Sequence, residues 1–79
     1  MASKYSVVIL KETGKDKFTD VKSFPVTNLE LARSVFSHHA KFVKWSRQYK
    51  ESMGLNPRDH GLVWLYDNTC HYELEEARF

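Results

Sequence analysis

Two strand-like segments open the chain, and a short polar stretch separates them. Residues 4–11 contain the apolar, β-branched run at 7–10, which is typical of a strand buried on both faces in the middle of a sheet. Turn residues follow at 13–16. Apolar and polar residues then alternate imperfectly over 18–26, and this segment ends near Pro25, which has no N–H to donate to a neighbouring strand. The pattern predicts a β-hairpin with an irregular second strand.

Helix-forming residues follow the hairpin without Gly or Pro, from Thr27 to the residue before Gly54. The first four of them match a capping box, with Thr27 as N-cap and Glu30 reaching back to it, and Val26 and Leu31 are placed as a hydrophobic staple. Gly54 stands where a left-handed residue commonly ends a helix. The sequence therefore predicts one continuous helix of about six turns.

A second pair of strand-like segments closes the chain, at 62–66 and 70–75, across turn residues at 67–69. Cys70 is expected to be an ordinary residue of the last strand. Two hairpins flanking one helix give the order ββαββ. This order predicts an α+β two-layer sandwich, in which a four-stranded antiparallel sheet carries the long helix on one face. No repeat or linker divides the chain, so a single domain is expected over residues 1–79.

The orientation of the third strand stays open. Its residues alternate between an aromatic-rich set (Leu62, Trp64 and Tyr66) and an aliphatic set (Val63 and Leu65), and successive strand residues point to opposite faces. If the aromatic set faces away from the helix, it forms an apolar patch for recognition. If it faces the helix, something else must cover the aliphatic set.

The predicted helix has an apolar side and a basic side. The apolar side is expected to pack on the sheet and consists of Leu31, Ala32, Val35, Phe36, His39, Phe42, Val43, Tyr49 and Met53. The basic side carries Arg33, Lys41, Lys44 and Arg47, with Trp45 at its border beside His38. Two interpretations are open. The basic side either binds nucleic-acid phosphates or the acidic surface of a protein, with Trp45 as the anchor, or it is an ordinary solvated helix face.

Three groups of side chains are candidates for chemistry. His39 on the apolar side is expected to be a core histidine satisfied by one hydrogen bond, and the alternative is a buried catalytic or metal-binding histidine. His71, Glu73 and Glu75 alternate onto one strand face about 7 Å apart, too far to share a metal ion unless the strand bends. Cys70 and His71 point to opposite faces, which separates a possible nucleophile from its base.

Composition narrows the functional classes. With 12 Lys and Arg against 10 Asp and Glu, the net charge of +2 does not demand an anionic partner. A single cysteine excludes an intramolecular disulfide and fits a reducing compartment, and neither a membrane span nor a signal peptide is apparent, so a cytoplasmic location is expected. Phosphate-binding, nucleophile-elbow and zinc motifs are absent, so no enzyme activity, cofactor or metal is expected.

The order of the elements resembles that of small phage-encoded proteins that disable host machinery, including anti-CRISPR proteins and phage inhibitors of host RNA polymerase. The resemblance is architectural. It rests on the first hairpin, on the helix-opening segment at 26–32 and on the closing hairpin that starts at 61–66. It implies a non-enzymatic inhibitor that occupies a surface of a bacterial host protein or ribonucleoprotein complex.

The leading expectation is thus a protein-binding module with Arg33, Lys41, Lys44, Trp45 and Arg47 as its contacts. The aromatic residues of the last hairpin are the second choice. The alternative is a small nucleic-acid-binding protein that uses the same basic helix, whose affinity would fall steeply with salt. A homodimer is also considered, because an uncovered sheet face or edge invites self-pairing.

Overall fold

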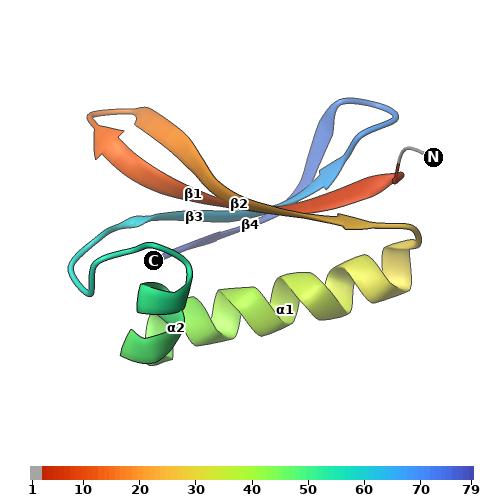
Figure 1. Cartoon of the computed structure of the whole chain (residues 1–79). Coiled ribbons are helices and arrows are strands. Elements are labelled where there is room, and N and C mark those ends of the chain that lie inside the picture. The colour runs from red at the N-terminus through yellow and green to blue at the C-terminus, as the bar shows by residue number, and fades with distance from the viewer. Residues whose placement is uncertain (1–2) are drawn as a thin grey trace.

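The computed structural model of the chain describes residues 3–79. In this part of the chain the elements are β1 (Tyr5–Gly14), β2 (Lys17–Val26), α1 (Leu29–Trp45), α2 (Arg47–Ser52), β3 (Gly61–Asp67) and β4 (Tyr72–Arg78). The four strands form one antiparallel sheet in the order β2-β1-β3-β4, and α1 lies across one face of it (Figure 1). The predicted α+β fold is confirmed. No helix within residues 3–79 is long and apolar enough to cross a membrane.

The apolar run of the first strand explains why β1 lies at the centre of the sheet. Val7 and Ile9 are fully buried on the face that carries α1. Leu10 points to the other face, where it pairs with Leu62 of β3 and is also buried. The irregularity predicted in the second strand is a bulge at Val21, which has no partner residue on β1.

The orientation of β3 settles which of its two sets faces the helix. Val63 and Leu65 are fully buried in the core that β1, β3 and α1 share. Trp64 and Tyr66 therefore face away from α1, and both are partly buried. Figure 1 shows the tips of both hairpins bending away from α1, so the outer face of the sheet is concave. The aromatic pair thus belongs to the outer face, the alternative in which the sequence predicted an apolar patch for recognition.

The last strand begins later than predicted. Cys70 is exposed in the turn before β4, which starts at Tyr72, so the expectation of a strand cysteine is wrong. The carboxylate of Asp67 accepts hydrogen bonds from the backbone N–H groups of Thr69 (2.8 Å) and Cys70 (3.2 Å). These bonds fold the chain into a turn and leave His71 in a left-handed conformation with φ of 53°.

The start of α1 is shifted by one residue from the prediction. Asn28 is the N-cap, and its side-chain oxygen accepts a hydrogen bond of 2.8 Å from the Leu31 backbone N–H. Thr27 is therefore not the cap. The predicted staple is also wrong, because Val26 is buried whereas Leu31 is exposed.

The predicted continuous helix is broken at Ser46, and this is the largest correction to the sequence analysis. Ser46 has extended backbone angles, and its N–H still donates to the Phe42 carbonyl at 2.9 Å as the last bond of α1. Its hydroxyl oxygen accepts a hydrogen bond of 3.1 Å from the Tyr49 N–H and so caps α2. A serine favours this conformation because its side chain replaces the lost helical bonds.

The segment after α2 is fixed against the sheet. Gly54 ends α2 with φ of 80°, the left-handed conformation that the sequence predicted. The ammonium group of Lys50 donates hydrogen bonds to the backbone oxygens of Pro57 (3.1 Å) and Asp59 (3.0 Å). The same group lies 5.3 Å from the centre of the Phe79 ring, beyond the end of β4. Lys50 is therefore engaged within the domain.

Candidate functional site

The buried side of α1 is narrower than predicted. Its buried residues are Ala32, Phe36, His39 and Val43. Leu31 and Phe42 were expected to pack on the sheet, but they are 50% and 38% exposed. A single sheet layer covers only one stripe of a helix, so the broad apolar side divides into a covered part and an uncovered part.

Leu31 and Phe42 lie in a longer stripe along α1 that also includes Trp45 and His38, from the border of the predicted basic side. We call it the aromatic stripe, and it consists of Leu31, Val35, His38, Phe42 and Trp45. Their spacing alternates between four and three residues, which keeps them on one side of a helix. Trp45 is 82% exposed, although tryptophan is usually well buried in folded proteins. Leu31, His38, Phe42 and Trp45 are exposed and Val35 is partly buried, and such a row of large side chains marks a candidate interaction surface.

A buried aromatic cluster supports the stripe from beneath. The ring of His39 stacks on Phe24 of β2, with centres 4.3 Å apart and planes 16° from parallel. His39 Nδ1 and the Tyr49 hydroxyl are hydrogen-bonded, which ties α2 to α1. Phe42 of the stripe has its ring centre 4.7 Å from that of His38 and 6.3 Å from that of Tyr49. His39 is 8% exposed and is the hydrogen-bonded core histidine that the sequence predicted.

Burial shifts the pKa values of His39 and Tyr49 in this cluster. Desolvation, and then the nearby charge of His38, hold the pKa of His39 below its ordinary value of 6.5. Burial raises the pKa of Tyr49 to about 12. Both groups are therefore neutral at pH 7, and the hydrogen bond between them joins two uncharged partners.

A pH dependence of stability follows from His39. Because its pKa is lowered in the folded protein, the unfolded chain takes up the proton more readily, and the free energy of unfolding should fall as the pH decreases below about 6.5. One proton contributes a slope of at most about 1.4 kcal/mol per pH unit, and the fall ends once the pH is below the folded-state pKa. Urea unfolding between pH 7.5 and pH 5 measures it. In the His39→Gln variant the free energy of unfolding should depend less on pH. An unchanged pH dependence in this variant would mean that His39 is not its source.

The predicted contacts do not form one continuous site. Arg33 lies about three turns from Lys44, and its Nε is 3.9 Å from a carboxylate oxygen of Glu75 on β4. The other cations lie near Trp45, at the end of α1 and the start of α2. We call them the basic flank, and they are Lys41, Lys44 and Arg47. All three are exposed, so four of the five predicted contacts occupy one end of α1.

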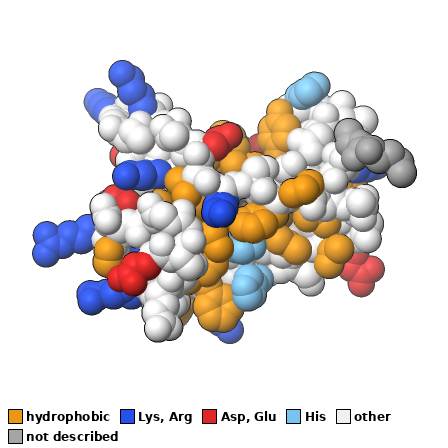
Figure 2. Space-filling view, viewed as in Figure 1, with side chains coloured by type: hydrophobic (Ala, Val, Ile, Leu, Met, Phe, Trp, Pro, Cys, Tyr) orange, Lys and Arg blue, Asp and Glu red, His pale blue; other side chains and the backbone are white. Residues whose placement is uncertain are grey.

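Figure 2 shows one face of the molecule with its side chains coloured by type. Hydrophobic and histidine side chains gather in the middle of the view, where β2 passes over α1, while Lys and Arg side chains project mainly on the side of α2 and the first hairpin. From Leu31 to Lys50 the chain contains no Asp or Glu. The acidic residues of the two helices are Glu30 in the first turn of α1 and Glu51 in α2, just outside this span.

The possible metal row on the last strand is broken. A register shift beside Tyr66 places Glu73 opposite that residue on the outer face, whereas Glu75 lies opposite Leu65 on the helix face. His71 belongs to the preceding turn. Within residues 3–79, no three His, Cys, Asp or Glu side chains come together to hold a metal ion.

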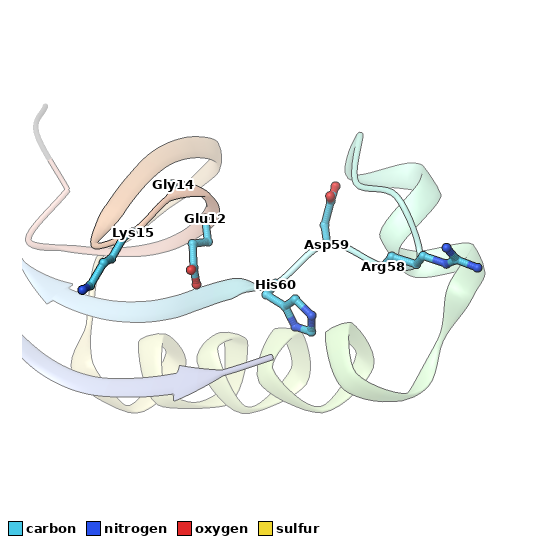
Figure 3. A pocket seen from close by; sticks show the side chains of 6 residues that line it. All are labelled: Glu12, Gly14, Lys15, Arg58, Asp59 and His60. Atoms are coloured by element: carbon cyan, nitrogen blue, oxygen red, sulfur yellow. The ribbon is translucent and has the colours of Figure 1, made fainter.

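A shallow hollow of about 480 Å³ lies between the first hairpin and the loop before β3. Its lining residues are Glu12, Gly14, Lys15, Arg58, Asp59 and His60. Figure 3 shows that their side chains spread in different directions, with Arg58 extending away from Glu12 and Lys15. Its lining contains both acidic and basic side chains, and these do not converge on one point. The exposed face of α1 is therefore the stronger candidate.

Sequence reasoning missed Leu31 and Phe42 as surface residues. The spacing of residues could have separated them. Two series on α1 share the same alternation of three and four residues and are displaced by one position: Leu31, Val35, His38, Phe42 and Trp45, and Ala32, Phe36, His39 and Val43.

A scan against protein-family models and searches of curated proteins and solved structures found no match for this chain.

Proposed function

We propose that this chain is a protein-binding module that engages its partner through the exposed face of α1. Trp45 is the anchor, and the basic flank of Lys41, Lys44 and Arg47 lies near it at the end of α1 and the start of α2. The observation that carries the proposal is the 82% exposure of Trp45 on the same side of α1 as the exposed Leu31 and Phe42. Trp and Arg dominate the energetics of protein interfaces, whereas Leu31 and Phe42 offer nothing to a phosphate backbone.

The module acts by occupying a surface and not by catalysis. In this proposal it covers a functional surface of a bacterial host defence or transcription complex, as phage-encoded inhibitors do. The ββαββ order that it shares with such inhibitors supports the proposal. The packing of α1 on the sheet and the bond between His39 and Tyr49 support it too, because an inhibitor without a catalytic group depends on a preorganised surface.

Nucleic-acid binding by the basic flank is the second candidate function. The absence of acidic residues from Leu31 to Lys50 favours it. Contacts of three cations with phosphates would make the affinity fall with salt, with a log–log slope of about −0.9 for each phosphate contacted on duplex DNA. A partner bound mainly through apolar side chains should show a much weaker dependence.

Charge reversal of the basic flank tests the proposal. The tagged protein is used to capture partners from bacterial lysate, with and without nuclease, and they are identified by mass spectrometry. Capture should survive nuclease and should fall at least about tenfold in the Lys44→Glu/Arg47→Glu variant, because both cations border the anchor. The matched control is Lys15→Glu/Lys17→Glu, which makes the same charge change at the first hairpin and should retain capture.

Two results would contradict the proposal. Capture that depends on intact nucleic acid would favour the second candidate. Capture that is equally strong in both charge-reversal variants would place the interaction on another face.

A further inference from the structure

We infer that the aromatic stripe docks one α-helix of the partner, and that this helix is amphipathic with acidic residues beside its apolar side. The inference rests on the proposed function and names the chemistry of the partner. It also extends the interface from the Trp45 end of α1 to Leu31, near the other end of the helix.

The spacing of the stripe favours a helix as the partner. Intervals of four, three, four and three residues give an average of 3.5, the repeat with which two helices keep contact along a shared seam. From Leu31 to Trp45 the seam is about 21 Å long at 1.5 Å per residue. A partner helix of about four turns that crosses α1 at a small angle would contact all five stripe positions.

The neighbouring edge of the sheet does not favour an added strand. β2 is an edge strand next to α1, and a partner strand would have to pair along it. Pro25 lacks a donor, and the bulge at Val21 interrupts the regular spacing of backbone groups. Both features are typical of edges that are protected against pairing, so the helix face is the better docking surface.

The stripe is held in place before any partner binds. Its neighbouring residues on α1 are buried against the sheet, and Phe42 and His38 lie beside the buried pair of His39 and Tyr49. Val35 is partly buried and packs against the core. In the middle of the stripe a docking helix would therefore meet Val35, His38 and Phe42 already packed against neighbouring side chains, which lowers the entropy cost of binding there.

The charge of the surface selects an acidic helix. Lys41 lies on the solvent side of the stripe, and Lys44 and Arg47 lie at its Trp45 end, with no Asp or Glu from Leu31 to Lys50. Glutamates or aspartates beside the apolar residues of the partner would pair with these cations and set its register. A second copy of this chain is a poorer occupant, because it would bring another surface of the same sign of charge.

Photo-crosslinking from the stripe tests the inference. Benzoyl-phenylalanine replaces Phe42, partners are crosslinked in nuclease-treated lysate, and mass spectrometry identifies the joined segment. The segment should have apolar residues three and four apart and an excess of Asp and Glu. A synthetic peptide of that segment should gain helical circular dichroism on binding and should quench or shift the fluorescence of Trp45.

Substitution at the far end of the stripe separates this inference from the proposed function. Leu31→Ser should weaken binding of the peptide at least about tenfold, whereas the matched control Leu74→Ser, another exposed leucine on β4, should leave it unchanged. If Leu31→Ser has no effect while Lys44→Glu/Arg47→Glu abolishes capture, the helix-docking inference fails and the proposed function stands. An extended bound peptide or a crosslink to a second copy would also overturn the inference. Loss of all capture after nuclease would overturn both.

Discussion

Replacement of Gly61 by Ala is expected to destabilise the protein by about 3 kcal/mol, although it adds only one methyl group. A Cβ atom on Gly61 would lie 1.9 Å from the backbone oxygen of Leu10 and 2.9 Å from Cζ of Phe79. The Phe79 ring can turn aside, but the Leu10 oxygen belongs to β1, which pairs with β3 along its length. β1 and β3 must separate to make room, and the two strands form the centre of the sheet.

A matched glycine in the first hairpin provides the control. A Cβ on Gly14 would meet only side-chain atoms of Lys17, the nearest at 3.7 Å, so Gly14→Ala should change the free energy of unfolding by less than about 0.5 kcal/mol. Urea unfolding followed by circular dichroism measures both variants. A loss below about 1 kcal/mol in Gly61→Ala would contradict the prediction and would mean that the two central strands adjust at little cost.

The strands were predictable because their signals are local. The apolar run at 7–10 places β1 between two neighbours, and the turn residues around Gly14 and Asn68 mark the two hairpins. The side on which β3 presents Trp64 was not predictable. Both of its sets are apolar, and only the packing of Val63 and Leu65 against α1 distinguishes them.

The break in the helix was not predictable because it depends on a distant contact. Residues on both sides of Ser46 favour helix, and serine is only mildly unfavourable inside one. The extended conformation at Ser46 lets α2 turn so that Tyr49 reaches His39, ten positions earlier in the chain. Periodicity along the sequence contains no information about this hydrogen bond.

The sequence analysis named the cations and Trp45 of the candidate site and placed Leu31 and Phe42 in the core. Exposed cations are recognised easily, because Lys and Arg rarely point into a core. Leu31 and Phe42 were assigned to the core because hydrophobicity alone does not tell which part of a wide apolar side the sheet covers. The orientation of α1 decides this, and that orientation depends on the packing of Phe36 and Val43.

The edges of the sheet give a reason to expect interactions through α1. Pro25 and the bulge at Val21 interrupt β2. β4 carries acidic residues on both faces, including Glu75 on the helix side, and its register shifts beside Tyr66. These features are those by which natural sheets avoid pairing with other chains. We therefore expect any partner to engage α1 and not these edges.

Trp45→Ala is expected to weaken partner binding by about 2 kcal/mol or more, a fall in affinity of about 30-fold, while the stability of the fold stays within about 0.5 kcal/mol. The two effects separate because the indole ring is 82% exposed in the free protein. Its removal leaves no cavity in the core and costs only the surface that a partner would cover. Calorimetric or fluorescence-anisotropy titration with the captured partner measures the affinity, and urea unfolding measures the stability.

A second exposed aromatic residue distinguishes a specific anchor from nonspecific binding through any exposed ring. Tyr72, on β4, is 63% exposed and lies outside the α1 face. Tyr72→Ala removes a ring of comparable exposure, and it should leave the affinity within about twofold, because contacts outside the centre of an interface contribute little. Equal losses in both variants would mean that the partner responds to exposed rings in general. A loss confined to Trp45→Ala would place the energetic centre of the interface where α1 ends.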